Sequence, residues 1–178
     1  WNATHALTAL LAHGDDAVGN LLIGDQARER FLAAAEPLPV PRAEVPARYV
    51  QYAVEAARGE APGSSAGGEQ PKFTAYVETP EGPRHVLVKF SEREAGPVSE
   101  RWRDLLLAEH LALQVLRDGG VAAARSTLFD HDGQRFLEVE RFDRVGARGR
   151  RALLSLRVLD AEFVGTGNAP WPAIVSAL

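Results

Sequence analysis

The chain has 178 residues, 46% of them hydrophobic and 25% charged, which is the composition of a globular protein large enough to bury a core. Its net charge of −4, with both signs interspersed, does not predict a nucleic-acid-binding surface, although arginines cluster between Arg141 and Arg151. The absence of cysteine excludes disulfide bonds and cysteine-based metal sites or nucleophiles, and no apolar run approaches the ~20 residues of a membrane span. The chain begins at Trp1 and contains no methionine, so we expect it to be a piece of a longer protein.

Residues 1–58 are predicted to form a small N-terminal α/β subdomain. Asp15 and Asp16 lie between glycines, which indicates a turn leading into a short strand over residues 20–23. An acidic pair in a turn also suggests a metal site. Without further spaced oxygen ligands, however, a solvated turn is the simpler interpretation.

Two helices are expected in the same region. Asp25 is in the position of an N-cap for a helix over residues 26–35, in which Phe31 and Leu32 face inward. A second helix over residues 46–58 carries apolar residues at the spacing of one helical face.

A loop rich in glycine and serine, residues 63–73, occupies the centre of the chain. Glycine lets a backbone approach an anion closely, and consecutive N–H groups form anion-binding nests, so this loop is suited to cover phosphates. A run of this composition is also typical of a plain surface linker, and taken alone it favours the linker. The alternating residues 73–78 and 85–90 that follow predict two strands of a hairpin.

Lys89 and Glu109 are charged residues in apolar surroundings. Lys89 interrupts the apolar strand 85–90, so it either lies on the solvent face or requires a partner. Glu109 lies among leucines in a long helix over residues 100–118, for which Ser99 is the expected cap. Taken alone, such an acid is expected at the solvated edge of the apolar stripe.

Two further strands are predicted over residues 124–130 and 134–140, joined by a glycine-containing hairpin loop. Asp130, His131 and Asp132 resemble a metal cluster in composition, but a tight hairpin tip explains them more simply. Beyond the second strand, the final part of the chain is expected to contain short helices near residues 158–163 and 170–178.

The order of these elements predicts an α+β fold like the small lobe of a protein kinase, with an antiparallel sheet and a long helix. A glycine-rich loop, a strand lysine, a helix acid and a polar exit from the sheet are the parts of such an ATP site. We assign residues 59–142 to this lobe and residues 143–178 to the incomplete start of a helical large lobe. Neither the Walker pattern nor the standard Gly-x-Gly-x-x-Gly kinase loop is present.

The chain resembles the HipA family of serine/threonine kinases, which are toxins of bacterial toxin–antitoxin pairs and their stand-alone relatives. Four stretches carry the resemblance: residues 64–73, 88–91, 108–113 and 139–144. The Gly-Gly-Glu-Gln-Pro-Lys form of the loop is similar to the YjjJ-like branch, and the resemblance extends from about residue 13 to the end. The loop and the Glu-Arg-Phe-Asp-Arg exit are the more specific of these features.

The resemblance implies a role for each matching position. Lys89 would contact the ATP phosphates and Glu109 would hold Lys89, while Ser64 or Ser65 would be the loop serine that such kinases autophosphorylate. The backbone of Glu140 and Phe142 would contact adenine. The ATP-binding positions implied in this way are Ser65, Ala66, Gly67, Gly68, Gln70, Lys72, Lys89, Glu140 and Phe142.

Two departures from the family pattern matter. The loop has one more residue before Lys72 than the best-known HipA loops, so the matching serine is not fixed. The family's catalytic and metal-binding aspartates lie further along than Asp143, and no Asp-x-His-x-Lys-Asn loop occurs before Leu178. We therefore expect a fragment that is inactive alone and that lacks the Mg²⁺ ligands of its parent kinase.

The parent protein implied by the resemblance is a cytoplasmic, ATP- and Mg²⁺-dependent kinase acting on a protein serine or threonine. In the family the substrate is often an aminoacyl-tRNA synthetase, and an antitoxin is a further expected partner. DNA would be contacted only through a partner or a segment before Trp1, and no membrane contact is expected. A small-molecule phosphotransferase, a non-catalytic module of a toxin–antitoxin complex and a regulatory domain remain alternatives.

Overall fold

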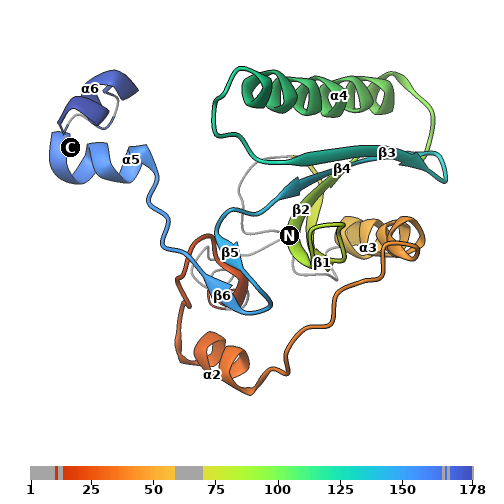
Figure 1. Ribbon diagram of the computed structural model, residues 1–178, viewed down its shortest axis with the longest axis horizontal. Coiled ribbons are helices and arrows are strands. Elements are labelled where there is room, and N and C mark those ends of the chain that lie inside the picture. The colour runs from red at the N-terminus through yellow and green to blue at the C-terminus, as the bar shows by residue number, and fades with distance from the viewer. Residues whose placement is uncertain (1–10, 12–13, 59–69, 166, 168, 178) are drawn as a thin grey trace.

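A four-stranded antiparallel sheet in the order β1-β2-β4-β3 forms the centre of the protein (Figure 1). The computed structural model describes residues 11, 14–58, 70–165, 167 and 169–177. The strands are β1 (Lys72–Val77), β2 (Arg84–Phe90), β3 (Ser126–His131) and β4 (Gln134–Glu140). Each predicted strand of the sheet is present, displaced by at most a residue or two at its ends. The α+β class is therefore observed.

Helix α3 (Val45–Arg58) covers one face of this sheet. Its Tyr49 is fully buried, with ring centroids 5.2 Å from Phe73 and 5.8 Å from Phe136. The strand residues Val86 and Val88 complete this core. The helix precedes the predicted subdomain boundary at residue 58 but packs in the same core as the strands that follow it; the boundary itself stays a prediction.

Helix α4 (Pro97–Asp118) lies against the other face of the sheet (Figure 1). Leu106 is fully buried there, whereas Leu105 is 46% exposed. The helix begins earlier than predicted, with Gly96 at the N-cap and Pro97 in the first turn. Ser99 is therefore not the cap: it lies inside the helix, and its hydroxyl donates to the Glu92 carbonyl at 3.2 Å.

The described part of the N-terminal region consists of helices and irregular backbone, and the predicted strand over residues 20–23 is wrong. The short 3₁₀ helix η1 (Gly14–Asp16) is followed by irregular backbone, and the Ile23 N–H donates back to the Gly14 carbonyl at 3.1 Å. Gly19 and Gly24 have φ of 80° and 86°, a conformation that interrupts a strand. The expected α/β character of this subdomain is thus corrected to mainly helical.

Helix α2 (Asp25–Ala33) matches the first predicted helix, with two corrections. Gly24 is the N-cap and Asp25 is the first helical residue, so the aspartate caps nothing. Leu32 is 66% exposed rather than inward-facing. Phe31 does contact the rest of the protein, beneath the guanidinium groups of Arg148 and Arg150.

After the sheet, the chain forms the small hairpin β5 (Arg144–Val145) and β6 (Gly149–Arg150) beside η1 (Figure 1). The last elements are α5 (Leu156–Leu159), the π-helical turn η2 (Asp160–Val164) and α6 (Trp171–Ser176). They lie apart from the sheet in Figure 1. Among the helices of the described residues, none has the length and apolar character needed to cross a membrane.

Candidate functional site

Lys89 and Glu109 meet over the sheet face opposite α3. The alternation of β2 directs Val86 and Val88 into the α3 core, which leaves Lys89 on the other face. Its Nζ donates to both carboxylate oxygens of Glu109, each at 2.7 Å. The side chains are 21% and 33% exposed, so the pair is partly screened from water. The expected approach of these two residues is thus observed.

Lys72 adds a second ammonium group to this pair. It begins β1 and is the register partner of Lys89 across the β1–β2 ladder. Burial lowers the pKa of Lys72, and the charge of Lys89 lowers the same pKa further, while Glu109 opposes both. Two cations beside one carboxylate leave an excess of positive charge on a half-buried surface, which favours the binding of an anion.

Gln70 lies directly before β1 and adds a donor at this end of the sheet. Its side-chain nitrogen Nε2 is buried and has no hydrogen-bond partner among the residues that the structure describes. A buried donor without a partner is costly, so a ligand that accepts from it would stabilise the site. The other predicted loop positions, Ser64, Ser65, Ala66, Gly67 and Gly68, lie outside the described residues.

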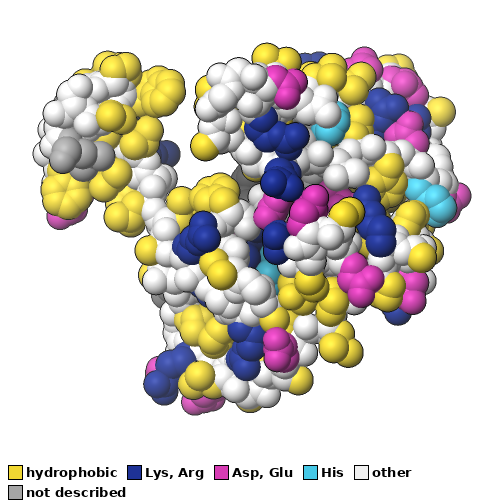
Figure 2. Space-filling model, in the orientation of Figure 1, with side chains coloured by type: hydrophobic (Ala, Val, Ile, Leu, Met, Phe, Trp, Pro, Cys, Tyr) yellow, Lys and Arg dark blue, Asp and Glu magenta, His cyan; other side chains and the backbone are white. Residues whose placement is uncertain are grey.

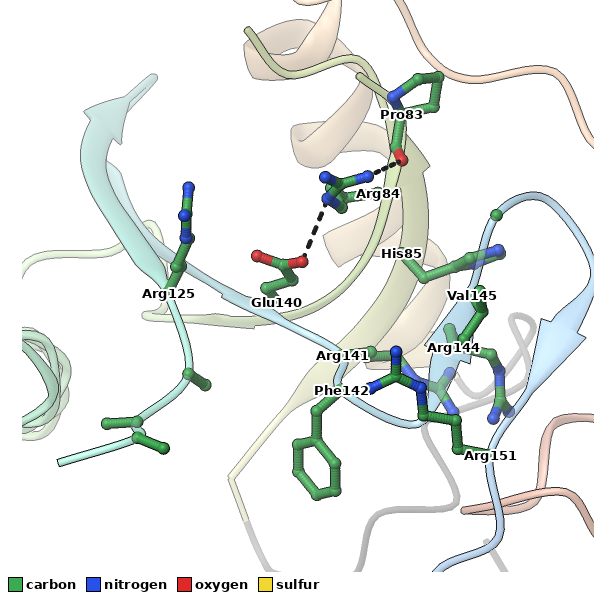
Figure 3. Close-up of a pocket in the computed structure, with 14 residues that line it drawn as sticks. Pro83, Arg84, His85, Arg125, Glu140, Arg141, Phe142, Arg144, Val145 and Arg151 are labelled. Carbon is green, nitrogen blue, oxygen red and sulfur yellow. Dashed lines mark hydrogen bonds and ion pairs between the residues drawn. The ribbon is translucent and has the colours of Figure 1, made fainter. Parts of the chain in front are cut away.

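The exit from β4 lines a separate cavity of about 550 Å³ at the end of the sheet (Figure 3). Glu140 and Phe142 both line it, and Glu140 forms an ion pair with Arg84 at 3.2 Å. Lys89 and Glu109 are not among its lining residues. The structure therefore does not place the two halves of the predicted ATP site in one cavity of the described residues.

The backbone at this exit is only partly hydrogen-bonded. The Glu140 N–H donates to the Arg125 carbonyl at 2.8 Å and the Arg141 N–H donates to the His85 carbonyl at 2.9 Å. Within the described part of the chain, the Phe142 N–H has no acceptor.

In the space-filling view, basic and acidic side chains are gathered between α4 and the β5–β6 hairpin (Figure 2).

The acidic pair before this region contacts arginines. Asp15 forms an exposed ion pair with Arg30 at 2.8 Å. Asp16 pairs with Arg141 at 2.9 Å and with Arg144 at 2.7 Å. Asp16 is thus 35% exposed and ion-paired as well as part of a turn, and the arginine contacts give no support to the metal interpretation.

The Asp130-His131-Asp132 segment is the tip of the β3–β4 hairpin. Asp130 pairs with Arg135 at 2.8 Å, and Asp132, which has a φ of 48°, pairs with Arg93. Among the residues that the structure describes, no three potential metal-binding side chains form a cluster. The hairpin interpretation accounts for these residues.

A composition signal at this site was overlooked in the sequence. The chain has 20 lysine and arginine residues, and only two of them, Lys72 and Lys89, are lysines. Both lie on the paired strands β1 and β2. A rare residue type at two strand positions would have indicated a shared site. Asp16 carried no comparable signal because its partners are 125 and 128 residues away.

A family model for the HipA-like C-terminal domain matches residues 64–163, which is more than half of the chain. The chain belongs to the HipA-like C-terminal domain family. The matched residues of this HipA-like domain include the four-stranded sheet, α4, Lys72, Lys89 and Glu109. A second family model, the YjjJ-like toxin middle domain, matches residues 1–32, which contain η1 and all of α2 except its last residue.

Among curated proteins, this HipA-like chain is similar to Toxin YjjJ of Escherichia coli (strain K12), with 43% identity over 179 residues. The alignment covers 100% of the chain but 40% of that protein, so the chain spans about two fifths of its relative. No solved structure gives a significant match.

Proposed function

We propose that the chain contributes the upper half of the nucleotide site of an ATP-dependent protein serine/threonine kinase. The observation that carries this proposal is the contact of Lys89 Nζ with both carboxylate oxygens of Glu109, beside Lys72 on the adjoining strand. A strand lysine held by a helix acid is the arrangement with which protein kinases hold ATP phosphates. Membership in the HipA-like family supports the same activity.

The residues present fit a triphosphate. Lys72 is a buried cation beside a second cation, and the Gln70 side-chain nitrogen is a buried donor with no partner in the described part of the chain, so both would be stabilised by phosphate oxygens. ATP supplies the transferred phosphoryl group, and Mg²⁺ neutralises its oxygens. Glu109 keeps the Lys89 ammonium oriented, and the loop before β1 would cover the phosphates with Ser65, Ala66, Gly67 and Gly68.

In the separate cavity at the end of the sheet, the Phe142 N–H and the Glu140 carbonyl would bind adenine. The Phe142 N–H has no acceptor among the described residues, so it can donate to a ring nitrogen without breaking a bond. The acids that would bind Mg²⁺ and orient the attacking hydroxyl are expected downstream of residue 178. This chain alone would then have no kinase activity and at most weak nucleotide affinity.

The biological role follows that of the relative. Toxin YjjJ is named as a toxin, and we propose that this chain belongs to a cytoplasmic toxin of the same kind, with a protein substrate and an antitoxin partner. An aminoacyl-tRNA synthetase is our candidate substrate, and contact with DNA would be made only through a partner or another segment. Autophosphorylation of Ser64 or Ser65 would inactivate the enzyme.

The test uses the full-length protein incubated with ATP and Mg²⁺, followed by mass spectrometry of the peptide that contains Ser64 and Ser65. We expect a phosphate on one of these serines in the wild-type protein. The Lys89→Ala variant should lack it, because ATP would no longer have the Lys89 ammonium group beside its phosphates. Arg93→Ala, which removes an exposed cation at the hairpin tip, is the control and should leave the modification unchanged. Phosphorylation at the wild-type rate in Lys89→Ala would contradict the proposal.

A further inference from the structure

The N-terminal turn, residues 14–19, is joined to the exit of the sheet by a network of alternating charges. Arg141 Nη1 donates to both Asp16 carboxylate oxygens at 2.9 and 3.0 Å, and Arg144 Nη2 donates to Asp16 at 2.7 Å. Thr74 on β1 donates to the same carboxylate at 3.2 Å. One aspartate of the turn therefore contacts β1 and the segment after β4 together.

A second aspartate closes the network from the exit side. Asp143 accepts from Arg141 Nε and Nη2, each at 3.0 Å, and from Arg144 Nη1 at 2.6 Å. It also accepts from the backbone N–H of Gly19 at 3.0 Å. Arg144 in turn donates to the carbonyls of Ala17 and Gly19 at 3.0 and 2.9 Å. Side chains of the exit thus bind the backbone of the turn directly.

Burial makes these contacts stronger than surface ion pairs. The side chains of Arg144, Asp143 and Arg141 are 5%, 7% and 9% exposed, and the Asp16 side chain that they hold is 35% exposed. Asp15, the neighbour of Asp16, pairs with Arg30 instead, and both of those side chains are 44% exposed. Partly desolvated charge pairs with several hydrogen bonds hold their geometry, whereas exposed pairs contribute little.

The network holds the exit at three positions. Arg141, Asp143 and Arg144 contact the turn, and the cavity at the end of the sheet is lined by Glu140, Arg141, Phe142 and Arg144 (Figure 3). Residues 141–144 form a turn, in which the Arg144 N–H donates to the Arg141 carbonyl at 3.4 Å. Holding the three side chains restrains the backbone of this turn, and with it the direction of the Phe142 N–H and the Glu140 carbonyl.

We propose that Asp16 is a positioning residue for the nucleotide site: through Arg141, Arg144 and Asp143, it sets the backbone course of residues 140–143 and hence the contacts to adenine. The adenine part of this inference rests on the proposed function. The turn lies within the YjjJ-like middle-domain match and the exit within the HipA-like match, so the network links two separately matched units. A change that displaces the turn, residues 14–19, would therefore weaken the binding of adenine.

The test compares Asp16→Asn with Asp16→Glu and Asp15→Asn in the full-length protein. Amide hydrogen exchange at Glu140, Arg141 and Arg144 is measured first, without nucleotide. We expect exchange about tenfold faster in Asp16→Asn, and near-wild-type exchange in the other two variants. The KM for ATP should rise about tenfold in Asp16→Asn with a smaller change in kcat, because the residue touches neither the phosphates nor the acceptor.

The outcomes separate this inference from the proposed function. Unchanged exchange in Asp16→Asn would overturn the positioning role, as would faster exchange with an unchanged KM for ATP. A wild-type protein that binds no ATP would overturn the proposed function, and the exchange result would then decide alone whether the turn holds the exit. If Asp16→Asn does not fold, Thr74→Val, which removes a single hydrogen bond to Asp16, should change exchange in the same direction to a smaller extent.

Discussion

At the scale of single residues, lysine and arginine have different functions in this protein. Arg141 and Arg144, whose guanidinium groups remain charged, are buried and pair with the distant Asp16. The two lysines instead lie next to each other, where the pKa of Lys72 is lowered by burial and by Lys89. A compact ammonium whose pKa responds to its surroundings is suited to an anion site that is emptied and refilled.

His85 is expected to make the free energy of unfolding depend on pH. Burial lowers its pKa, and Arg141 and Arg144 lower that pKa further, against a contact between His85 Nε2 and the Ala147 carbonyl at 3.0 Å. The folded protein keeps the ring neutral where the unfolded chain takes up a proton. We therefore expect stability to be constant above about pH 6.5 and to fall as the pH drops below it.

Urea denaturation between pH 5 and pH 8 measures this effect. His85→Gln should flatten the part of the profile below pH 6.5, and His131→Gln, at the exposed hairpin tip, should leave the profile as in the wild type. A profile that keeps its full slope in His85→Gln would exclude His85 as the cause.

Glu138 is a buried acid whose counterion comes from outside the sheet. Its side chain is 5% exposed and accepts from Arg42 Nη1 at 2.7 and 3.1 Å. Burial raises the pKa of Glu138, while Arg42 opposes that rise. Because Arg42→Met leaves this carboxyl group without its partner, we expect a loss of about 3 kcal/mol in the free energy of unfolding.

Arg30→Met is the matched control for Arg42→Met, because it breaks the exposed pair with Asp15 and should cost less than about 0.5 kcal/mol. Chemical denaturation measures the free energy of unfolding of both variants. An equal loss in the two would show that burial of Glu138 does not make its ion pair more stabilising than an exposed one.

At the scale of elements, hydrophobic periodicity predicted most of the sheet and the two helices that cover it. Period-two alternation identified β1 and β2, and helical spacing identified α3 and α4. The errors lie where local signals compete. Glycines with positive φ on either side of residues 20–23 prevented the strand there, and Gly96 with Pro97 began α4 before Ser99.

Helix α4 packs on the sheet through a buried leucine and is also held there by polar contacts. Leu106 is fully buried, Glu109 binds Lys89, and His110 Nδ1 lies 2.9 Å from the Ser126 hydroxyl. Leu106→Ala should therefore cost about 3 kcal/mol in the free energy of unfolding, because it removes packing and leaves a cavity. The neighbouring Leu105→Ala should cost less than about 0.5 kcal/mol, since Leu105 is already 46% exposed.

Thermal or urea unfolding of these two leucine variants tests the attachment of α4. A cost for Leu105→Ala as large as that for Leu106→Ala would mean that another surface covers the exposed face of the helix.

At the scale of the whole molecule, the candidate site is assembled from segments that sequence reasoning treated separately. Lys89 and Glu109 were predicted together because their order along the chain matches a known arrangement. The contact of Asp16 with Arg141 joins residues 125 positions apart, and local pattern carries no information about such a pairing. The Gly/Ser-rich loop, whose composition was informative, lies mostly outside the described residues, so its role stays a prediction.

If the chain holds ATP as we propose, Lys72 and Lys89 face its phosphates. An acyl-phosphate derivative of ATP transfers its acyl group to amines beside its phosphates, and peptide mass spectrometry of the full-length protein reports which lysines are modified. We expect acylation of Lys72 and Lys89 that excess ATP prevents. Labelling of these two lysines that excess ATP leaves unchanged, or labelling of neither, would contradict this expectation.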